Sequence, residues 1–421
     1  MTTVAYIANE FPSALEPYVM DEIGELRRRG TKVICCSGKR VSPLDLSLSE
    51  RAYWKETRYF QPLTDETLMH AARCFVSDRR NRWPLLKPLL LDPTASLGLR
   101  LRALGHTLMG SALANELAPL DVQHIHAHHG YFASWMALVA ARLLGIGFSF
   151  TLHGSDLLRR ADLLAAKLQA CNFCVTVSDF NRRYILERYP QIAPEKIIVR
   201  RLGVNRVLPW PSAPPEPVSH IVRPFCLLAV GRLHAVKDYR FLIDACSALR
   251  GEGLDFLCWI VGEGPERRAL ERQIVKLKLQ GLVHLVGQVP RAEVARYYQH
   301  ADLVVMTSQS EGIPVVLMEA MSHQKLVLAP AITGIPELVN DHRTGFLYEP
   351  GSLLDFINSV AWIFANQGSM ADVRRAAAAT VADSYNRQRN LRAFAQDFLA
   401  RISDTDGDHA HSVLQQVRLS V

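Results

Sequence analysis

The chain has 421 residues, more than one hydrophobic core usually organises, so two domains are expected. Hydrophobic residues make up 49% and charged residues 21% of the chain, which excludes a disordered or fibrous protein. Residues 1–205 hold 26 Lys and Arg against 19 Asp and Glu, whereas residues 206–421 hold 22 of each class, so the net charge of +7 belongs to the first half. This excess either favours an anionic partner, such as a phosphorylated acceptor or an acidic membrane surface, or is an ordinary basic surface. No nucleic-acid-binding motif accompanies it, so nucleic acid is not an expected partner.

The N-terminal residues lack the basic region, apolar stretch and cleavage site of a signal peptide. No window reaches the ~18 uninterrupted apolar residues that span a bilayer. We therefore expect a cytoplasmic protein. The cysteines lie mostly inside apolar runs and are expected to be reduced core residues. Cys171 and Cys174 form a C-x-x-C pair without a second pair at zinc spacing, so we interpret both as packing residues.

Short apolar runs alternate with helical patterns in the first half of the chain. Strands are predicted over residues 4–8, 32–36, 124–128, 148–152, 173–178 and 197–201. Helices are predicted over residues 18–29 and 132–144, where apolar side chains recur at intervals of three and four. The segment 79–108 mixes basic residues with Trp83 and many leucines, and either contacts an anionic membrane surface or forms a buried helix pair.

A second alternating region follows a stretch rich in proline. Residues 208–224 contain six prolines, which predicts a linker. Strands are then predicted over residues 225–230, 256–261, 283–286, 303–307 and 325–329. The pattern predicts an α/β protein with two doubly wound parallel-sheet domains, residues 1–207 and 225–384, followed by a helix at 385–403 and a polar tail at 404–421. Because open parallel sheets bind ligands at the carboxyl ends of their strands, the site is expected between the two domains.

The most specific motif, S-Q-S-E-G-I-P-V-V-L-M-E-A, occupies residues 308–320 and directly follows a predicted strand. Its phosphate-binding candidates offer free helix-start amides or a close backbone approach, and they are Gly312, Ile313, Pro314 and Val315. Glu311 precedes the helix and Glu319 lies about two turns into it, so the two carboxylates reach different parts of one ligand. The alternative is a helix-cap partner and an ordinary surface acid.

The motif G-R-L-H-A-V-K at residues 231–237 follows another predicted strand. Gly231 opens the loop, and Arg232 and Lys237 place two cations on it. Two fixed cations suit a diphosphate, and they can neutralise the charge that develops on a departing nucleoside diphosphate. Basic loops are otherwise simply solvated.

Two weaker motifs complete the second half. Gly262 and Gly264, in V-G-E-G-P, either let the backbone approach a base or phosphate or only reverse the chain. Thr333, Gly334 and Glu337, in T-G-I-P-E, are candidate ligand neighbours or ordinary loop-to-helix residues.

Histidines stand out in the first half. The segment T-L-H-G-S-D places His153 and Asp156 at the end of a predicted strand, where His153 either faces the site or is an ordinary strand-end histidine. Asp156 is a candidate for binding an acceptor. The segment H-I-H-A-H-H at 124–129 places alternate histidines on one strand face, but we expect no metal there.

These motifs together resemble a retaining glycosyltransferase of family 4, which has the GT-B fold of two Rossmann-like domains. The resemblance covers nearly the whole chain and is most specific at Arg232, Lys237, Glu311 and Glu319, which follow the order of the family's donor-binding motif. It implies that the two cations hold the donor diphosphate, that Glu311 contacts the donor sugar and that Glu319 binds the ribose. It also implies that no metal or other cofactor is needed.

The resemblance extends to the first half, which it makes the acceptor-binding domain. It implies that His153 contacts the donor sugar and that attack occurs from the front face. The loop N-E-F-P-S-A-L-E-P-Y-V resembles the F-P-x-x-S-E-T-F-I variant of bacterial exopolysaccharide and colanic-acid-type transferases. Phe11, Pro12 and Glu16 match this variant, whereas Leu15 and Pro17 depart from it. Glu16 thereby becomes an acceptor-binding candidate.

The resemblance thus implies a metal-independent retaining hexosyltransferase. Its expected donor is a nucleoside diphosphate sugar, UDP-linked in the leading hypothesis, and its expected acceptor is a glycan, free or attached to a polyprenyl diphosphate, in surface polysaccharide biosynthesis. Peripheral contact with the cytoplasmic membrane face accompanies a lipid-linked acceptor. Two alternatives remain open, a sugar-nucleotide epimerase or hydrolase of the same fold and a non-catalytic glycan-binding subunit.

Overall fold

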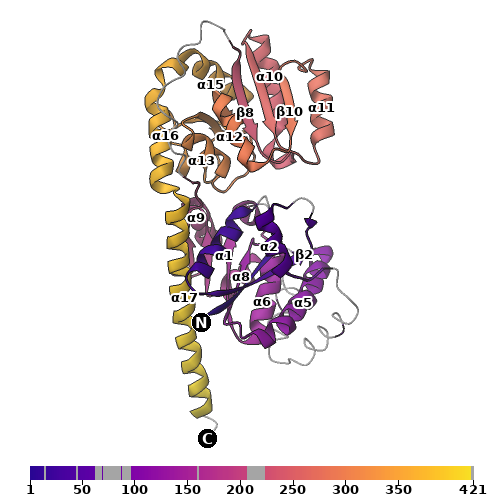
Figure 1. Cartoon of the computed structure of the whole chain (residues 1–421), viewed down its shortest axis with the longest axis vertical. Coiled ribbons are helices and arrows are strands. Elements are labelled where there is room, and N and C mark those ends of the chain that lie inside the picture. The colour runs from indigo at the N-terminus through magenta and orange to yellow at the C-terminus, as the bar shows by residue number, and fades with distance from the viewer. Residues whose placement is uncertain are drawn as a thin grey trace. The chain divides into compact units, whose positions relative to one another are not determined.

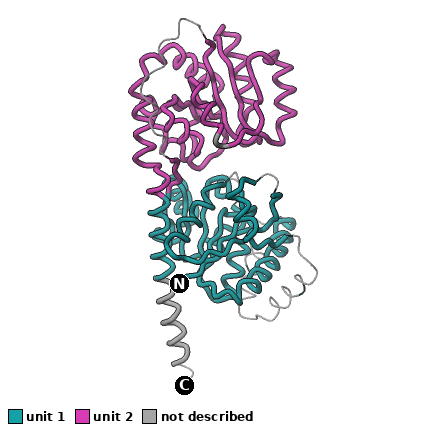
Figure 2. Tube along the Cα trace, in the orientation of Figure 1, with its two compact units in different colours: residues 1–200, 391–421 teal, residues 201–390 magenta. Residues whose placement is uncertain are grey.

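The computed structural model describes residues 1–13, 16–43, 46–61, 96–158, 161–205 and 223–418, together with Met69 and Lys87. It consists of two compact units (Figure 2). The first comprises Met1–Arg200 with Leu391–Val421, and the second comprises Arg201–Asn390. Both are built from parallel strands and helices (Figure 1).

The first unit contains a seven-stranded parallel sheet with the strand order β3-β2-β1-β4-β5-β6-β7. The strands are β1 (Thr3–Glu10), β2 (Lys32–Lys39), β3 (Arg58–Tyr59), β4 (His124–His128), β5 (Gly147–Leu152), β6 (Phe173–Thr176) and β7 (Ile197–Val199). Each strand predicted from the sequence is present, with ends shifted by a few residues. The two-residue edge strand β3 is too short for its alternation to be recognised in the sequence.

The helices described in the first unit are α1 (Pro17–Arg28), α2 (Leu48–Glu56), α5 (Leu97–Leu117), α6 (Phe132–Leu144), α7 (Ser155–Leu158), α8 (Leu164–Ala170) and α9 (Asp179–Arg188), with 3-10 turns at Ala118–Leu120 and Pro194–Lys196. Helix α6 covers the range expected for it and ends because Gly145 adopts the left-handed conformation. Helices α5 and α6 approach closely at Gly110, where a Cβ atom would lie 2.7 Å from Cβ of Val139.

The second unit contains a six-stranded parallel sheet with the order β10-β9-β8-β11-β12-β13. Its strands are β8 (Phe225–Val230), β9 (Phe256–Val261), β10 (Val283–Gly287), β11 (Leu303–Val305), β12 (Leu326–Pro330) and β13 (Phe346–Tyr348). Its helices are α10 (Tyr239–Gly251), α11 (Arg267–Lys276), α12 (Arg291–His300), α13 (Val315–Ser322), α14 (Ile335–Leu338), α15 (Leu353–Asn366) and α16 (Ala371–Ser384), with 3-10 turns at Ala235–Lys237 and Gln367–Ser369. Strand β13 was not predicted.

Each sheet separates two layers of hydrophobic core. Successive side chains of a strand point to opposite faces, so Leu227 and Leu228 of β8 belong to different core clusters. In the first unit, Ile7 packs on one face and Tyr6 on the other. This burial on both faces explains why the strands have near-continuous apolar sequences.

Helix α17 (Arg387–Arg418) carries the C-terminal part of the chain. From Leu391 onward it belongs to the first unit, where Phe394, Phe398 and Ile402 join the core that also contains Tyr6. The sequence predicts a helix that ends at residue 403 with a polar tail beyond it, whereas α17 continues to Arg418. No described helix combines the length and apolarity needed to cross a membrane.

Two predicted segments fall largely outside the described residues. The proline-rich linker at 208–224 overlaps the gap between residues 205 and 223. The segment 79–108 is described only at Lys87 and from Ser96 onward, where residues 97–108 form the first half of α5.

Candidate active site

Four loops of the second unit follow the neighbouring strands β9, β8, β11 and β12. Because the strands are parallel, their carboxyl ends share one edge of the sheet, and the loops meet there. These loops contain nearly all the donor-binding candidates predicted from the sequence. Contacts between the loops hold several of these candidates close together.

An ion pair between Lys237 and Glu311 joins two of these loops. The Lys237 Nζ atom lies 2.6 Å from the Glu311 Oε1 atom, and their side chains are 22% and 14% exposed. The hydroxyl of Thr307 donates to the Lys237 carbonyl at 2.8 Å, and that of Thr333 donates to the Glu311 carbonyl at 2.6 Å. The two predicted residues are therefore brought together on a backbone that their neighbours fix.

Glycines let these loops pack directly against one another. A Cβ atom on Gly262, which has a φ of 148°, would lie 2.0 Å from the Gly231 carbonyl oxygen. A Cβ atom on Gly264 would lie 2.4 Å from the Leu233 oxygen, and one on Gly334 would lie 2.4 Å from the Gly312 oxygen. These positions require glycine because of contacts between loops, before any ligand is considered.

Helix α13 begins at Val315 after Pro314, in the order predicted, and no side chain caps its first turn. Ile313 and Pro314 are buried, so the surface at this helix start is formed by the backbone and not by these two side chains. The Glu319 carboxylate accepts a hydrogen bond from the Tyr298 hydroxyl at 3.1 Å. Free amides at a helix start suit an anionic group.

The remaining candidates of the second unit have other surroundings. Arg232 is exposed on the loop after β8. Glu337 lies in α14, with an oxygen 3.7 Å from the Arg201 guanidinium. Sequence reasoning missed Ser308 and Ser310, whose buried hydroxyls have no hydrogen-bond partner among the described residues. Their position on either side of Gln309, within the most specific motif, was the signal for them.

In the first unit, Asp156 anchors the loop after β4 and the loop after β5. Its buried carboxylate accepts hydrogen bonds from the amides of Gly130 at 2.9 Å, His153 at 3.0 Å and Gly154 at 2.8 Å. Burial alone would raise the pKa of Asp156, but His129, His153 and the Gly130 amide lower it well below its usual range. With its oxygens engaged in this way, Asp156 shapes the loops around His153.

Two carboxylates flank the His129 side chain. Its Nε2 atom lies 2.8 Å from Glu16 Oε1, and its Nδ1 atom lies 3.5 Å from Asp156 Oδ2. Burial opposes a charge on this ring, but the hydrogen bonds and charges of Asp156 and Glu16 raise the pKa of His129 to about 10. His129 is therefore a cation at neutral pH. Of its two carboxylate partners, Glu16 is the accessible one, with a side chain 28% exposed against 0% for Asp156.

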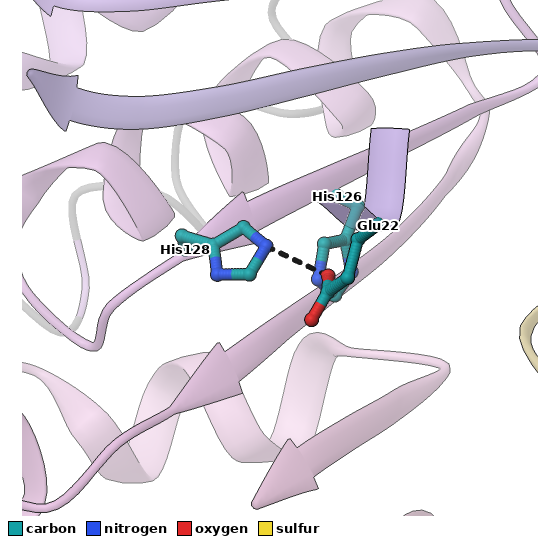
Figure 3. Close-up of side chains that lie close together, drawn as sticks. All are labelled: Glu22, His126 and His128. Carbon is teal, nitrogen blue, oxygen red and sulfur yellow. Dashed lines mark hydrogen bonds and ion pairs between the residues drawn. The ribbon is translucent and has the colours of Figure 1, made fainter. Parts of the chain in front are cut away.

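His128 of β4 is hydrogen-bonded to Glu22 of α1, and His126 lies close to this pair (Figure 3). Among the described residues, only Glu22, His126 and His128 group ligand atoms, all within 4.8 Å of one another, in a way that could hold a metal ion. Both ring nitrogens of His126 already have partners, Ser149 at 2.7 Å and Thr151 at 3.0 Å. The ring nitrogens of His126 are thus already hydrogen-bonded within the protein. Burial lowers the pKa of His126 well below its usual value.

Sequence reasoning missed Glu22. The signal was present, because Glu22 lies among the buried apolar residues Val19, Ile23 and Leu26 of α1, where Glu25 is the other buried acid. An acid on the apolar face of a helix needs a buried partner, and His128 supplies it.

The thiols of Cys171 and Cys174 are free and buried, as predicted. Burial raises the pKa of Cys171 to about 12, so this thiol stays protonated.

Both halves of the chain match models of known protein families. Residues 15–207 match the family model described as Glycosyltransferase Family 4, and residues 217–380 match the model described as Glycosyl transferases group 1. Among curated relatives, the putative colanic acid biosynthesis glycosyltransferase WcaL of Escherichia coli is 35% identical over 159 residues, which are 36% of this chain and 38% of WcaL. The amylovoran biosynthesis glycosyltransferase AmsK of Erwinia amylovora is 30% identical over 213 residues, 48% of this chain and 50% of AmsK.

Solved structures share the fold over nearly the whole chain. Sucrose-phosphate synthase from Thermosynechococcus elongatus has a TM-score of 0.73 at 18% identity and covers 96% of this chain and 100% of that one. HepE of Anabaena, crystallised with UDP, has a TM-score of 0.66 at 16% identity and covers 95% of this chain and 100% of that one. The fold is therefore GT-B, as predicted.

The two family models together account for both halves of the chain, so the protein belongs to the family 4 and group 1 glycosyltransferases. This confirms the family predicted from the motifs. The matched regions span about 38% and 50% of the two curated relatives, so the activity and substrates of the whole protein are a matter for proposal.

Proposed function

We propose that the protein transfers a hexose from a nucleoside diphosphate sugar, UDP-linked in the first instance, to a glycan acceptor with retention of configuration. The observation that carries this proposal is the Lys237–Glu311 ion pair, at 2.6 Å, among glycine-packed loops. A carboxylate that accepts sugar hydroxyls and a cation that binds phosphate are thereby held side by side. HepE, which shares the fold, was crystallised with UDP, and this supports a uridine nucleotide.

Each candidate residue then has a defined task. Lys237 and Arg232 bind the diphosphate, and they stabilise the charge that develops on it as the bond to the sugar breaks. The free amides at the start of α13 bind the same group, Glu311 orients the sugar hydroxyls, and Glu319 binds the ribose. Since these cations supply the electrostatic stabilisation, the reaction needs no divalent metal.

The chemical step is a front-face displacement. The bond between the anomeric carbon and the phosphate oxygen breaks, and the acceptor hydroxyl forms the new bond on the same face. The departing diphosphate takes the proton of that hydroxyl. His153 contacts the donor sugar, while Glu16, the accessible carboxylate beside His129, binds the acceptor.

The proposed biological role is surface polysaccharide assembly in the cytoplasm. WcaL and AmsK, by their names, act in colanic acid and amylovoran biosynthesis. A polyprenyl-diphosphate-linked acceptor would bring the protein to the membrane face. Exposed Leu97, Leu101 and Leu104, spaced along one side of α5, support such a contact, as does the positive charge of residues 1–205.

The test is nucleotide release from UDP-glucose, UDP-galactose, UDP-N-acetylglucosamine and GDP-mannose, with and without extracted lipid-linked glycans. We expect acceptor-stimulated release from one donor, and its loss in Glu311→Gln. Glu271→Gln is the matched control, because Glu271 also pairs with a basic residue, Arg267, but on the exposed side of α11. It should retain wild-type turnover.

The same assay separates the alternatives. Release that does not depend on an acceptor and yields free sugar identifies a hydrolase, and a changed sugar nucleotide identifies an epimerase. Binding of the nucleotide sugar with no turnover of any donor would identify a binding subunit and refute the proposed transfer.

A further inference from the structure

A chain of buried hydrogen bonds leads from α1 to His153. The Glu22 Oε2 atom lies 3.0 Å from His128 Nε2, and the other ring nitrogen of His128, Nδ1, lies 3.2 Å from His153 Nε2 (Figure 3 shows the first contact). The side chains of Glu22 and His128 are 7% and 0% exposed. The outer nitrogen of His153, Nδ1, is buried and has no hydrogen-bond partner among the described residues.

The carboxylate at one end determines where the protons lie along this chain. An ionised carboxylate can only accept hydrogen bonds, so the single proton of a neutral His128 resides on Nε2. The Nδ1 atom of His128 is then a lone pair, which accepts the Nε2 proton of His153. That leaves Nδ1 of His153 as an acceptor. A protonated His128 would reverse the order and leave a proton on Nδ1 of His153.

The surroundings of His153 keep it neutral. Burial lowers its pKa well below the usual value, and the charge of His129 lowers it further, whereas Asp156 only partly opposes this. The ring of Tyr18 lies 4.6 Å away, centroid to centroid, and that of the His129 cation lies 4.7 Å away. A neutral ring with one fixed proton presents one defined acceptor atom.

We propose that Glu22, acting through His128, is a positioning residue that fixes His153 in the tautomer whose Nδ1 atom accepts a hydrogen bond from a hydroxyl of the donor sugar. This inference rests on the proposed transfer of a sugar, in which His153 touches the donor. It gives Glu22 a role in catalysis although Glu22 contacts no substrate. It also accounts for a charged residue on the apolar face of α1.

The tautomer can be measured without any substrate. Nitrogen-15 NMR of the full chain with labelled histidine, with His153 assigned by comparison with His153→Gln, should show an unprotonated Nδ1 in His153. In Glu22→Gln, whose amide can donate to His128, this signal should shift toward protonated Nδ1. Glu25→Gln is the matched control, because Glu25 is also buried on α1 but pairs with Arg28 and Arg29. A protonated Nδ1 in the wild type, or no change in Glu22→Gln, would overturn the inference.

Kinetics provide the second readout. With the active donor, Glu22→Gln should lower kcat by about 10- to 100-fold, the range for loss of a group that orients a ligating or catalytic histidine, and should change the donor KM little. Glu22→Asp keeps the charge and should recover part of the rate, and Glu25→Gln should match the wild type. Equal kcat values for Glu22→Gln and wild type, with the NMR shift present, would remove the catalytic role.

Failure of the inference and failure of the proposed function have different signatures. If the wild type transfers no sugar from any donor, the proposed function fails, while the NMR result still decides whether Glu22 sets the tautomer. Thermal unfolding of each variant shows whether a lost rate reflects a lost fold. If Glu22→Gln does not fold, the NMR and rates of Glu22→Asp decide, because a shorter carboxylate should leave the tautomer unchanged.

Discussion

The two units prepare their candidate residues in opposite ways. In the second unit, a part-exposed ion pair and close-packed glycines hold Lys237 and Glu311 at the edge of the sheet. In the first unit, Asp156 is buried and paired with His129, and His128 is buried and hydrogen-bonded to Glu22 and His153. Only selected atoms of this group remain without a partner among the described residues. The comparison shows a part-exposed charge pair in the second unit, which suits the charged ligand proposed for it, and charges in the first unit that are buried against one another.

The largest expected effect sharpens the view of the second unit. Lys237→Met removes the cation that is proposed to stabilise the departing diphosphate, and kcat/KM should fall by about 100- to 1000-fold, the range for loss of one electrostatic contact in a transition state. Lys276→Met is the control, since Lys276 lies exposed in the last turn of α11. Nucleotide release measures both variants. If they lose activity equally, Lys237 has no special part in the reaction.

The second prediction concerns the loop packing. In Gly262→Ala, the added Cβ would lie 2.0 Å from the Gly231 oxygen at a φ of 148°, so the loops must separate. We expect a loss of stability of about 2–3 kcal/mol and much weaker nucleotide binding. Gly281→Ala has open space around the new atom and should behave as wild type. Thermal unfolding and nucleotide titration check both, and unchanged binding in Gly262→Ala would argue against a ligand role for this loop.

A third prediction tests the buried charges of the first unit. The pKa of folded His129 is about 10, above the ordinary value of about 6.5, so its ion pairs stabilise the fold fully below pH 6.5. This stability is lost as the pH rises from 6.5 through about 10. Urea unfolding measures the fall in the free energy of unfolding between pH 6.5 and 10. In His129→Gln this fall should be smaller than in the wild type by about 2 kcal/mol.

The control for this titration is an exposed histidine. His284→Gln, on β10 of the second unit, should keep the wild-type pH dependence. If His129→Gln retains the same loss of stability between pH 6.5 and 10, the cation between Glu16 and Asp156 is not its source.

The smallest expected effect concerns metal removal. Because Arg232 and Lys237 are proposed to do the work of a metal ion, treatment with EDTA should leave turnover within about twofold of the untreated enzyme. Loss of activity that Mg²⁺ or Mn²⁺ restores would contradict this. A loss that only a histidine-binding metal such as Zn²⁺ restores would instead implicate the group of Glu22, His126 and His128.

Much of the second unit could be predicted from the sequence. The motif at 308–320 and the loop at 231–237 each follow an apolar strand, and glycine and proline mark where strand becomes loop and loop becomes helix. These signals are local, since φ preferences and side-chain alternation act within a few residues. The fold, the family and the meeting of Lys237 with Glu311 at one sheet edge follow from them.

Local patterns could not predict how the first unit pairs its buried groups. Glu22 and His128, which form a hydrogen bond, are 106 residues apart in the chain. Asp156 lies 26 residues from Gly130, whose amide donates a hydrogen bond to its carboxylate. Asp156 is predicted from the sequence to bind the glycosyl acceptor, because its carboxyl group can be recognised there whereas the backbone amides that surround it cannot. The two-residue strand β3 was missed for the same reason, since its place in the sheet depends on its pairing with β2.

The sequence by itself therefore determined the alternation of strands and helices and the position of the motifs that follow β8 and β11, because each depends on neighbours along the chain. The tertiary structure alone decided which buried charges face each other. The position of the proton on His153 depends on the carboxylate of Glu22 in α1, which is linked to His153 through His128. Burial makes such contacts strong, because a charge removed from water must be satisfied by whatever the fold places beside it.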